Sequence, residues 1–197
     1  MIYLIRHPRP RDAAGRCYGR ADVAVDFAAV ERAAASIRAR IPPRVFERAR
    51  IYSSPASRCL SLARVLAASR APVVAPVVAG ELAEMDFGRW EGLAWESVPR
   101  EELDRWAQDP WGYAPGGGES AAVLEARWRG WLEEVEPAAS AQSQPVLAVT
   151  HAGIIRVALA HAGLRHRLDA ARAAIEFGSV HEFGFSRSAG ELQRAAS

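Results

Sequence analysis

The chain contains no lysine, and all 25 of its basic residues are arginine. Without lysine it can form no Schiff base, and it has no P-loop lysine to hold a nucleotide phosphate. Genomic base composition is the preferred explanation of this usage, because alanine is also abundant and arginine content tracks no single function. The absence therefore removes two classes of chemistry and selects none of the others.

Cysteine is scarce, since only Cys17 and Cys59 occur and no Cys-x-x-Cys spacing is present. We therefore expect neither a disulfide framework nor a zinc–cysteine site, and we expect both thiols to be reduced. The three histidines His161, His166 and His181 show no metal-ligand spacing.

Long apolar runs are absent as well: no stretch of 18 hydrophobic residues occurs, so we expect no membrane span. Met1 leads straight into Ile2-Tyr3-Leu4-Ile5, without a basic segment or a cleavage site, and this favours a cytoplasmic location over secretion. The net charge of +2 is too small to indicate a nucleic-acid-binding protein.

The chain does contain short apolar runs that alternate with helical periodicity. Apolar runs predict strands at 2–5, 49–53, 73–78, 146–149 and 176–185, and Pro76 predicts that the third of these lies at a sheet edge. Helices are predicted at 27–40, from a Ser54 cap onward, at 119–135 and at 154–162. This order predicts an α/β fold, with a mostly parallel central sheet and helices on both faces.

A length of 197 residues fits one domain over 1–197. The region about 80–118 holds four of the six tryptophans and the run Gly116-Gly117-Gly118, and we interpret it as an insertion on the substrate side. Its tryptophans could line a substrate face, but core packing is the preferred interpretation. The glycine run resembles a phosphate loop but lacks the lysine and the spacing, so a loop that caps a helix is preferred.

Two of the predicted buried strands end in histidine, the first at Arg6-His7 and the fourth at Thr150-His151. Ligands of open parallel sheets bind beyond the carboxyl ends of the strands. If these two strands are neighbours, both histidines meet at that edge, and the strand that ends near Ser53 delivers Arg58 to the same place. Arginine suits phosphate through its planar fork, and a neutral histidine nitrogen can attack phosphorus.

Such a reaction needs an acid that protonates the leaving alkoxide. Glu84 is the best candidate, although Glu81, Asp86, Glu91 and Glu119 lie in or near the same region. A second histidine, His151, can hold the equatorial oxygens in the transition state.

Four motifs follow one another along the chain: Leu4-Ile5-Arg6-His7, then Ser53-Ser54-Pro55-Ala56-Ser57-Arg58, then the segment from Leu82 to Gly92, then Val149-Thr150-His151-Ala152-Gly153. With these motifs in this order, the chain resembles the histidine phosphatase superfamily, which includes phosphoglycerate mutases and α-ribazole phosphatases. They cover roughly residues 2 to 155, and together they are specific.

The resemblance implies a phosphoglycerate mutase-like fold and assigns a role to each matching residue. His7 becomes the phosphorylated nucleophile, Arg6, Arg58 and His151 bind the phosphoryl group, and Glu84 is the proton donor. The resemblance also implies no metal requirement, and we expect no cofactor.

The sequence departs from the family pattern at two positions. Pro8 follows the nucleophile in place of the usual glycine, so one backbone N–H is missing, and Ala13 stands where many relatives carry asparagine. Arg20, in the segment 15–22, could supply a compensating donor. Arg20 and Glu119 are therefore candidate substrate-binding residues.

The short chain, the segment from Glu84 to Gly92 and Cys17-Tyr18-Gly19-Arg20 resemble the α-ribazole phosphatase branch more than the mutases. That branch removes the 5′-phosphate of α-ribazole 5′-phosphate in cobalamin assembly. A broad-specificity phosphatase, a phosphoglycerate mutase and a non-catalytic phospho-ligand-binding module remain alternatives. We expect a small phosphorylated substrate, no nucleic-acid or membrane partner, and a homodimer through an edge strand as one option.

Overall fold

The computed structural model describes residues 1–11, 13–141, 144–185 and 192–194. Its sheet has six strands in the order β3-β2-β4-β1-β5-β6. Four of them run parallel, while β5 is antiparallel to β1 and β6 is antiparallel to β5. The strands are β1 (Ile2–Arg6), β2 (Arg50–Ser53), β3 (Val77–Val78), β4 (Val146–Thr150), β5 (Val180–Phe185) and β6 (Leu192–Arg194).

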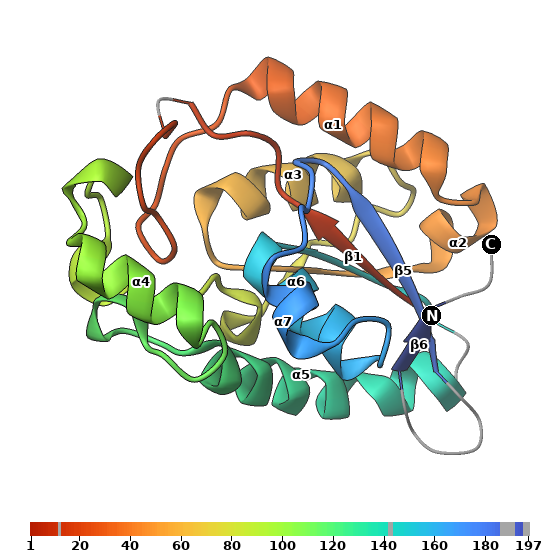
Figure 1. Cartoon of the computed structure of the whole chain (residues 1–197). Coiled ribbons are helices and arrows are strands. Elements are labelled where there is room, and N and C mark those ends of the chain that lie inside the picture. The colour runs from red at the N-terminus through yellow and green to blue at the C-terminus, as the bar shows by residue number, and fades with distance from the viewer. Residues whose placement is uncertain (12, 142–143, 186–191, 195–197) are drawn as a thin grey trace.

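Helices cover both faces of this sheet, as the sequence predicted (Figure 1). One face packs against α1 (Phe27–Arg40), α2 (Pro43–Arg48) and α3 (Ser57–Ala68). The other packs against α5 (Ala121–Ala141), α6 (Ala152–His161) and α7 (Arg167–Ala171). The predicted α/β architecture with a mostly parallel sheet is therefore confirmed.

The two central strands show why this sheet needs a layer of helices on each face. In β1, Ile2 and Leu4 enter the core beneath α5 and α6, whereas Tyr3 and Ile5 enter the core beneath α1 and α3. Successive side chains of a strand point to opposite faces, so a strand that is apolar throughout is stable only between two layers. The continuous apolar runs in the sequence reflect this double burial.

The segment 80–118 forms a layer of its own beside the sheet. It consists of the helix α4 (Arg100–Gln108) and short 3₁₀ turns at Gly80–Leu82, Gly88–Trp90, Trp95–Ser97 and Pro115–Gly117. Trp90, Val98 and Cys17 form a small separate core there. In Figure 1 this layer lies on the side toward which β1 runs, next to the loop that follows β1. Its assignment as a substrate-side insertion stays a prediction.

Several predicted boundaries were wrong. The third strand is only Val77–Val78, at the predicted edge position, and β5 begins at Val180 rather than at Glu176. The helix α5 continues through Pro137 to Ala141, because Val135 and Ala139 remain buried in the core on either side of the proline. Tertiary packing thus overrides a local helix-breaking signal.

Both cysteines are free and buried. Across the described residues, no helix is long and apolar enough to cross a membrane.

Candidate active site

The two motif histidines lie together at the carboxyl ends of the two central strands. The strands β1 and β4 pair in parallel, with Arg6 opposite Thr150, and the His7 N–H donates to the Thr150 carbonyl at 3.0 Å. The side chains that follow meet, with 5.1 Å between the ring centroids of His7 and His151. Both are almost fully buried, so the convergence that the sequence predicted is present.

His7 has a defined proton arrangement. Its Nδ1 lies 2.7 Å from the carbonyl oxygen of Pro8, and a carbonyl can only accept, so Nδ1 carries the hydrogen and Nε2 holds the lone pair. Burial lowers the pKa of His7 to about 3; the Pro8 hydrogen bond opposes this shift, and the charges of Arg58 and Arg6 add to it. The ring is therefore neutral at physiological pH, as a nucleophile must be.

His151 is also held neutral. Burial lowers its pKa well below the usual value, and His7, Arg58 and Arg6 lower it further. Its Nε2 lies 2.7 Å from the hydroxyl oxygen of Ser54. Ser54 was predicted to cap the following helix, but α3 begins only at Ser57, and this buried hydroxyl faces the histidine instead.

Arg58 is completely buried in the first turn of α3. Its terminal nitrogens donate to the carbonyl oxygens of Gly19 and Ala21, and Asp22 lies 3.7 Å away. Its Nε is buried and has no hydrogen-bond partner among the residues that the structure describes. Because an unpaired buried donor is costly, this atom is a ready donor for an anion.

Arg6 has other partners than Arg58. Its guanidinium donates to the carbonyl of Ile175 and lies over the ring of Phe177, 3.6 Å from the ring centroid. Its Nε is likewise buried and unpartnered. Phe177 also contacts the His7 ring, with a centroid distance of 5.6 Å. Phe177 was not predicted as a site residue, because nothing in the sequence shows that the loop before β5 returns to the end of β1.

Glu84 lies at the start of α6, beside His151. Its carboxylate accepts hydrogen bonds from the backbone N–H groups of Gly153 at 3.1 Å and Met85 at 3.0 Å. A Cβ on Gly153 would lie 2.1 Å from Glu84 Oε1, so only glycine lets the carboxylate approach this helix end. Glu84 and His151 line one cavity of about 260 Å³.

Arg20 and Glu119, the two further candidates, have different positions. Arg20 is exposed and lines the same cavity as Glu84 and His151. Glu119 is buried and bound by Arg127 at 2.9 Å, and it lies 3.6 Å from Arg20. Arg127 also donates to the carbonyls of Glu81 and Ala83, so it ties Glu119 to the segment that carries Glu84. The sequence analysis missed Arg127, because helical spacing alone gives no reason to single it out.

The loop after β1 is fixed by another carboxylate that the sequence analysis did not assign. Glu91 accepts hydrogen bonds from the backbone N–H groups of Gly19, Arg20 and Ala21. This bond set presents the carbonyls of Gly19 and Ala21 to Arg58. The segment around the predicted compensating donor is thereby anchored to the layer 80–118.

The sequence from residue 2 to residue 197 matches the profile of the histidine phosphatase superfamily, branch 1. The chain belongs to this superfamily. No curated protein sequence matches it closely enough to count as a relative.

Solved structures of the histidine phosphatase fold superimpose on it over nearly its whole length. A mycobacterial glucosyl-3-phosphoglycerate phosphatase in complex with VO3 has a TM-score of 0.80 and 22% identity, covering 98% of this chain and 96% of its own. An open reading frame product of Mycobacterium tuberculosis gives 0.76 and 23%, covering 99% and 95%. The phosphoglycerate mutase of Thermus thermophilus gives 0.67 and 23%, covering 100% and 98%. At these identities the likeness establishes the fold.

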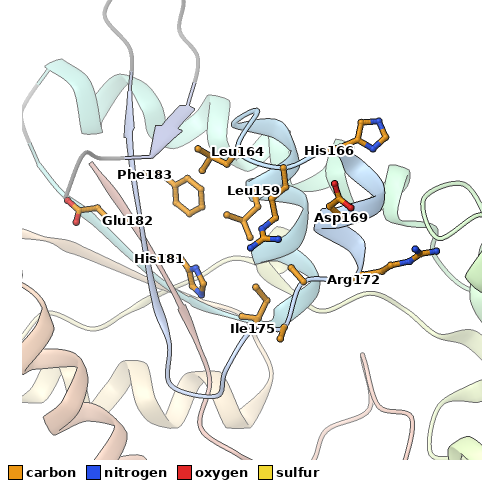
Figure 2. A pocket seen from close by; sticks show the side chains of 12 residues that line it. Leu159, Leu164, His166, Asp169, Arg172, Ile175, His181, Glu182 and Phe183 are labelled. Atoms are coloured by element: carbon orange, nitrogen blue, oxygen red, sulfur yellow. The ribbon is translucent and has the colours of Figure 1, made fainter.

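The protein also has a larger hollow of about 870 Å³, which neither His7 nor His151 lines. Figure 2 shows its lining from α6, α7 and β5, including Leu159, Asp169 and Phe183. None of the predicted site residues lines it. Among the described residues, no group of three or more His, Cys, Asp or Glu side chains could hold a metal ion.

Proposed function

We propose that this chain is a phosphomonoesterase that transfers a phosphoryl group to His7 and then to water. The observation that carries the proposal is the buried, neutral His7, whose Nδ1 is bonded to the Pro8 carbonyl so that Nε2 keeps its lone pair. A second neutral histidine lies beside it, and a fully buried arginine is near. Membership of the histidine phosphatase superfamily supports the same chemistry.

The reaction has two steps. In the first, His7 Nε2 attacks phosphorus, the bond between phosphorus and the leaving oxygen breaks, and the protonated Glu84 carboxyl gives its proton to that oxygen. In the second, Glu84 takes a proton from water as the water oxygen attacks the phosphohistidine. The phosphorus–nitrogen bond then breaks, and inorganic phosphate and neutral His7 are regenerated.

The phosphoryl oxygens are bound by Arg6, Arg58 and His151. The Nε atoms of Arg6 and Arg58 are buried donors without a partner, which an oxyanion can satisfy. The two arginines also lower the pKa of both histidines, so the pocket is electropositive before a ligand enters. A dianionic phosphoryl group compensates this charge, and the same donors hold the charge that develops on its equatorial oxygens.

The leaving group that we propose is the nucleoside of α-ribazole 5′-phosphate, as in cobalamin biosynthesis. The support is a second, narrow cavity that shares Glu84 with the first. Aromatic side chains line it, namely Phe87, Trp106 and Trp111, together with Pro110. At about 80 Å³ this cavity is smaller than a ligand pocket of about 300 Å³ or more, so an aromatic base enters only if these side chains move apart. Apolar aromatic walls next to the proton donor still favour an aromatic base over a small polar sugar.

The experiment is a comparison of phosphate release from α-ribazole 5′-phosphate and from other small phosphomonoesters, all with EDTA present. We expect the highest kcat/KM for α-ribazole 5′-phosphate, and Trp106→Ala should lower that value more than the value for a non-aromatic substrate. Equal rates across the panel would be consistent with the histidine mechanism but would reject the nucleoside of α-ribazole 5′-phosphate as the preferred leaving group.

The remaining alternatives give different products in the same assay. Transfer of the phosphoryl group between the hydroxyls of a phosphoglycerate, without net phosphate release, would indicate a mutase. Tight binding of phosphate without any turnover would indicate a binding module. Either result would overturn the proposed phosphatase.

A further inference from the structure

The phosphatase mechanism proposed above assigns no role to the buried hydroxyl of Ser54. Its oxygen lies 2.7 Å from His151 Nε2, and Ser54 is completely buried at the wall of the cavity that Glu84 and His151 line. Ser54 precedes α3 without capping it, because that helix begins at Ser57 with Ala56 as its N-cap. A buried hydroxyl needs an acceptor for its hydrogen, and this distance is that of a strong hydrogen bond.

The other contacts of this hydroxyl define its direction. The Ala56 N–H donates to Ser54 Oγ at 3.3 Å, so the oxygen already accepts one hydrogen bond. The other polar neighbour of this hydroxyl is the thiol of Cys59. The Cys59 Sγ also lies 3.4 Å from His151 Nε2 and 3.5 Å from the Thr150 carbonyl. Sulfur is a weak acceptor, whereas an unprotonated imidazole nitrogen is a good one. The Ser54 O–H therefore donates to His151 Nε2.

This hydrogen bond determines which ring nitrogen of His151 carries the hydrogen. A neutral imidazole carries one hydrogen, and burial keeps the pKa of His151 well below its usual value, so the ring has no second hydrogen. With Nε2 accepting, the hydrogen is on Nδ1. Its hydrogen-bonding contact among the described residues is the long one to Cys59 Sγ at 3.9 Å, and sulfur is a weak acceptor that a phosphoryl oxygen can replace.

We infer that Ser54 is a positioning residue that fixes His151 as its Nδ1–H tautomer, so that this N–H donates to an equatorial oxygen of the phosphoryl group. This inference rests on the proposed function for its last step, but the tautomer itself is a property of the ligand-free protein. The opposite tautomer would aim a lone pair at an anionic oxygen and repel it. In this role Ser54 acts through His151.

The arrangement gives the two rings complementary roles although both carry hydrogen on Nδ1. In His7 that hydrogen is bonded to the Pro8 carbonyl, which leaves a lone pair for attack on phosphorus. In His151 the lone pair is bonded to Ser54, which leaves a hydrogen for the phosphoryl oxygen. The difference between nucleophile and donor therefore lies in the neighbours of each ring, not in the rings themselves.

The direct test is nitrogen NMR of the ligand-free protein with ¹⁵N-labelled histidine. We expect His151 to show a protonated Nδ1 and an unprotonated Nε2, and Ser54→Ala to shift it toward the other tautomer or a mixture. Ser54→Thr, which keeps the hydroxyl, should restore the wild-type pattern. The matched control is Ser53→Ala, because Ser53 is equally buried but its hydroxyl donates to the Ser54 carbonyl instead of the ring.

The second test uses inorganic vanadate as a probe of the phosphoryl site. Ser54→Ala should weaken vanadate binding and lower kcat/KM by about tenfold to a hundredfold, as the loss of a partner that orients a functional histidine does, while Ser53→Ala should not. A wild-type His151 that is protonated on Nε2 would overturn the inference. Unchanged nitrogen signals and vanadate affinity in a folded Ser54→Ala protein would overturn it too.

These readouts also separate this inference from the proposed function. If the wild-type protein shows the expected tautomer and binds vanadate but hydrolyses no phosphomonoester, the role of Ser54 stands and the phosphatase assignment fails. If it hydrolyses substrate but His151 carries its hydrogen on Nε2, the phosphatase stands and the role of Ser54 is rejected. Circular dichroism of each variant confirms that it is folded before either comparison is made.

Discussion

At the scale of single residues, the chemistry of this site depends on hydrogen bonds that the side chains make to their nearest neighbours. His7 is bonded to the carbonyl of the residue that follows it, and this residue is Pro8. Proline has no N–H to offer the phosphoryl group, but its carbonyl still orients the nucleophile. The departure from the family pattern thus removes one donor and leaves the proton arrangement of His7 intact.

His7→Gln should abolish phosphoryl transfer, because glutamine has no nitrogen lone pair that can attack phosphorus. We expect kcat to fall by a factor of about 10³ or more, with no acid-labile phosphoenzyme trapped by rapid quenching. The matched control is His166→Gln, an exposed histidine at the start of α7, which should keep the wild-type rate. An unchanged rate in His7→Gln would remove His7 from its role.

Glu84→Gln should separate good leaving groups from poor ones. A general acid contributes about 10²–10⁴ to the rate when the leaving alkoxide is basic, so we expect an alkyl phosphate to lose about that much and 4-nitrophenyl phosphate to lose little. Glu96→Gln, at an exposed position, serves as the control. Equal losses on both substrates would make Glu84 a binding residue rather than an acid.

At the scale of elements, the aromatic cavity beside Glu84 depends on tight turns in the segment 80–118. Gly116 has a φ of +63° and packs against the backbone of the turn at Gly88, where a Cβ would lie 2.0 Å from the Phe87 carbonyl oxygen. Phe87 lines the cavity that we assign to the leaving group. The glycine run is therefore a packing device, which agrees with the interpretation that it is not a phosphate loop.

Gly116→Ala should destabilise the protein by about 2 kcal/mol or more, because the left-handed conformation alone costs about 1–2 kcal/mol for a non-glycine residue and the methyl group also meets the Phe87 backbone. Gly130→Ala is the matched control, since Gly130 lies within α5 with open space around it. It should stabilise by about 0.5–1 kcal/mol. Urea unfolding measures both, and a stable Gly116→Ala would contradict the packing argument.

At the scale of the whole molecule, the fold buries two neutral histidines among arginines. The pKa of His7 falls from 6.5 to about 3 on folding, mainly through burial. Between these two values the unfolded chain binds a proton at this position and the folded chain does not. Stability is therefore present above about pH 6.5 and is lost as the pH falls toward 3.

This linkage predicts a loss of about 1.4 kcal/mol of unfolding free energy per pH unit from His7 alone in that range. Urea unfolding at pH 7.5 and pH 5.0 measures the total loss, to which other groups also contribute. His7→Gln should lose about 2 kcal/mol less than the wild type between these pH values, whereas His166→Gln should lose as much as the wild type. Identical losses in all three proteins would show that His7 is not buried in neutral form.

Sequence patterns predicted the parts of this fold whose signals are local and strong. The apolar runs of β1 and β4 predicted two buried strands, and the histidine after each run predicted the place of the site. The cap at Ser54 was wrong, because a serine before a helix has the same local signal whether its hydroxyl bonds the helix or a histidine 97 residues away. The helix α4 was missed, since most of its residues are polar and no apolar run marks it; its small apolar face, Leu103 and Trp106, packs against the core of its own layer.

By itself, the sequence determined the α/β class, the order of the four motifs and the residue types that could bind and transfer a phosphoryl group. Only the tertiary structure decided that Phe177 lies against Arg6, that Arg127 holds Glu119 and that the Ser54 hydroxyl faces His151. The physical reason is that hydrophobic periodicity and turn signals act over a few residues. The proton positions and the burial that make two histidines neutral depend on contacts between segments far apart in the chain.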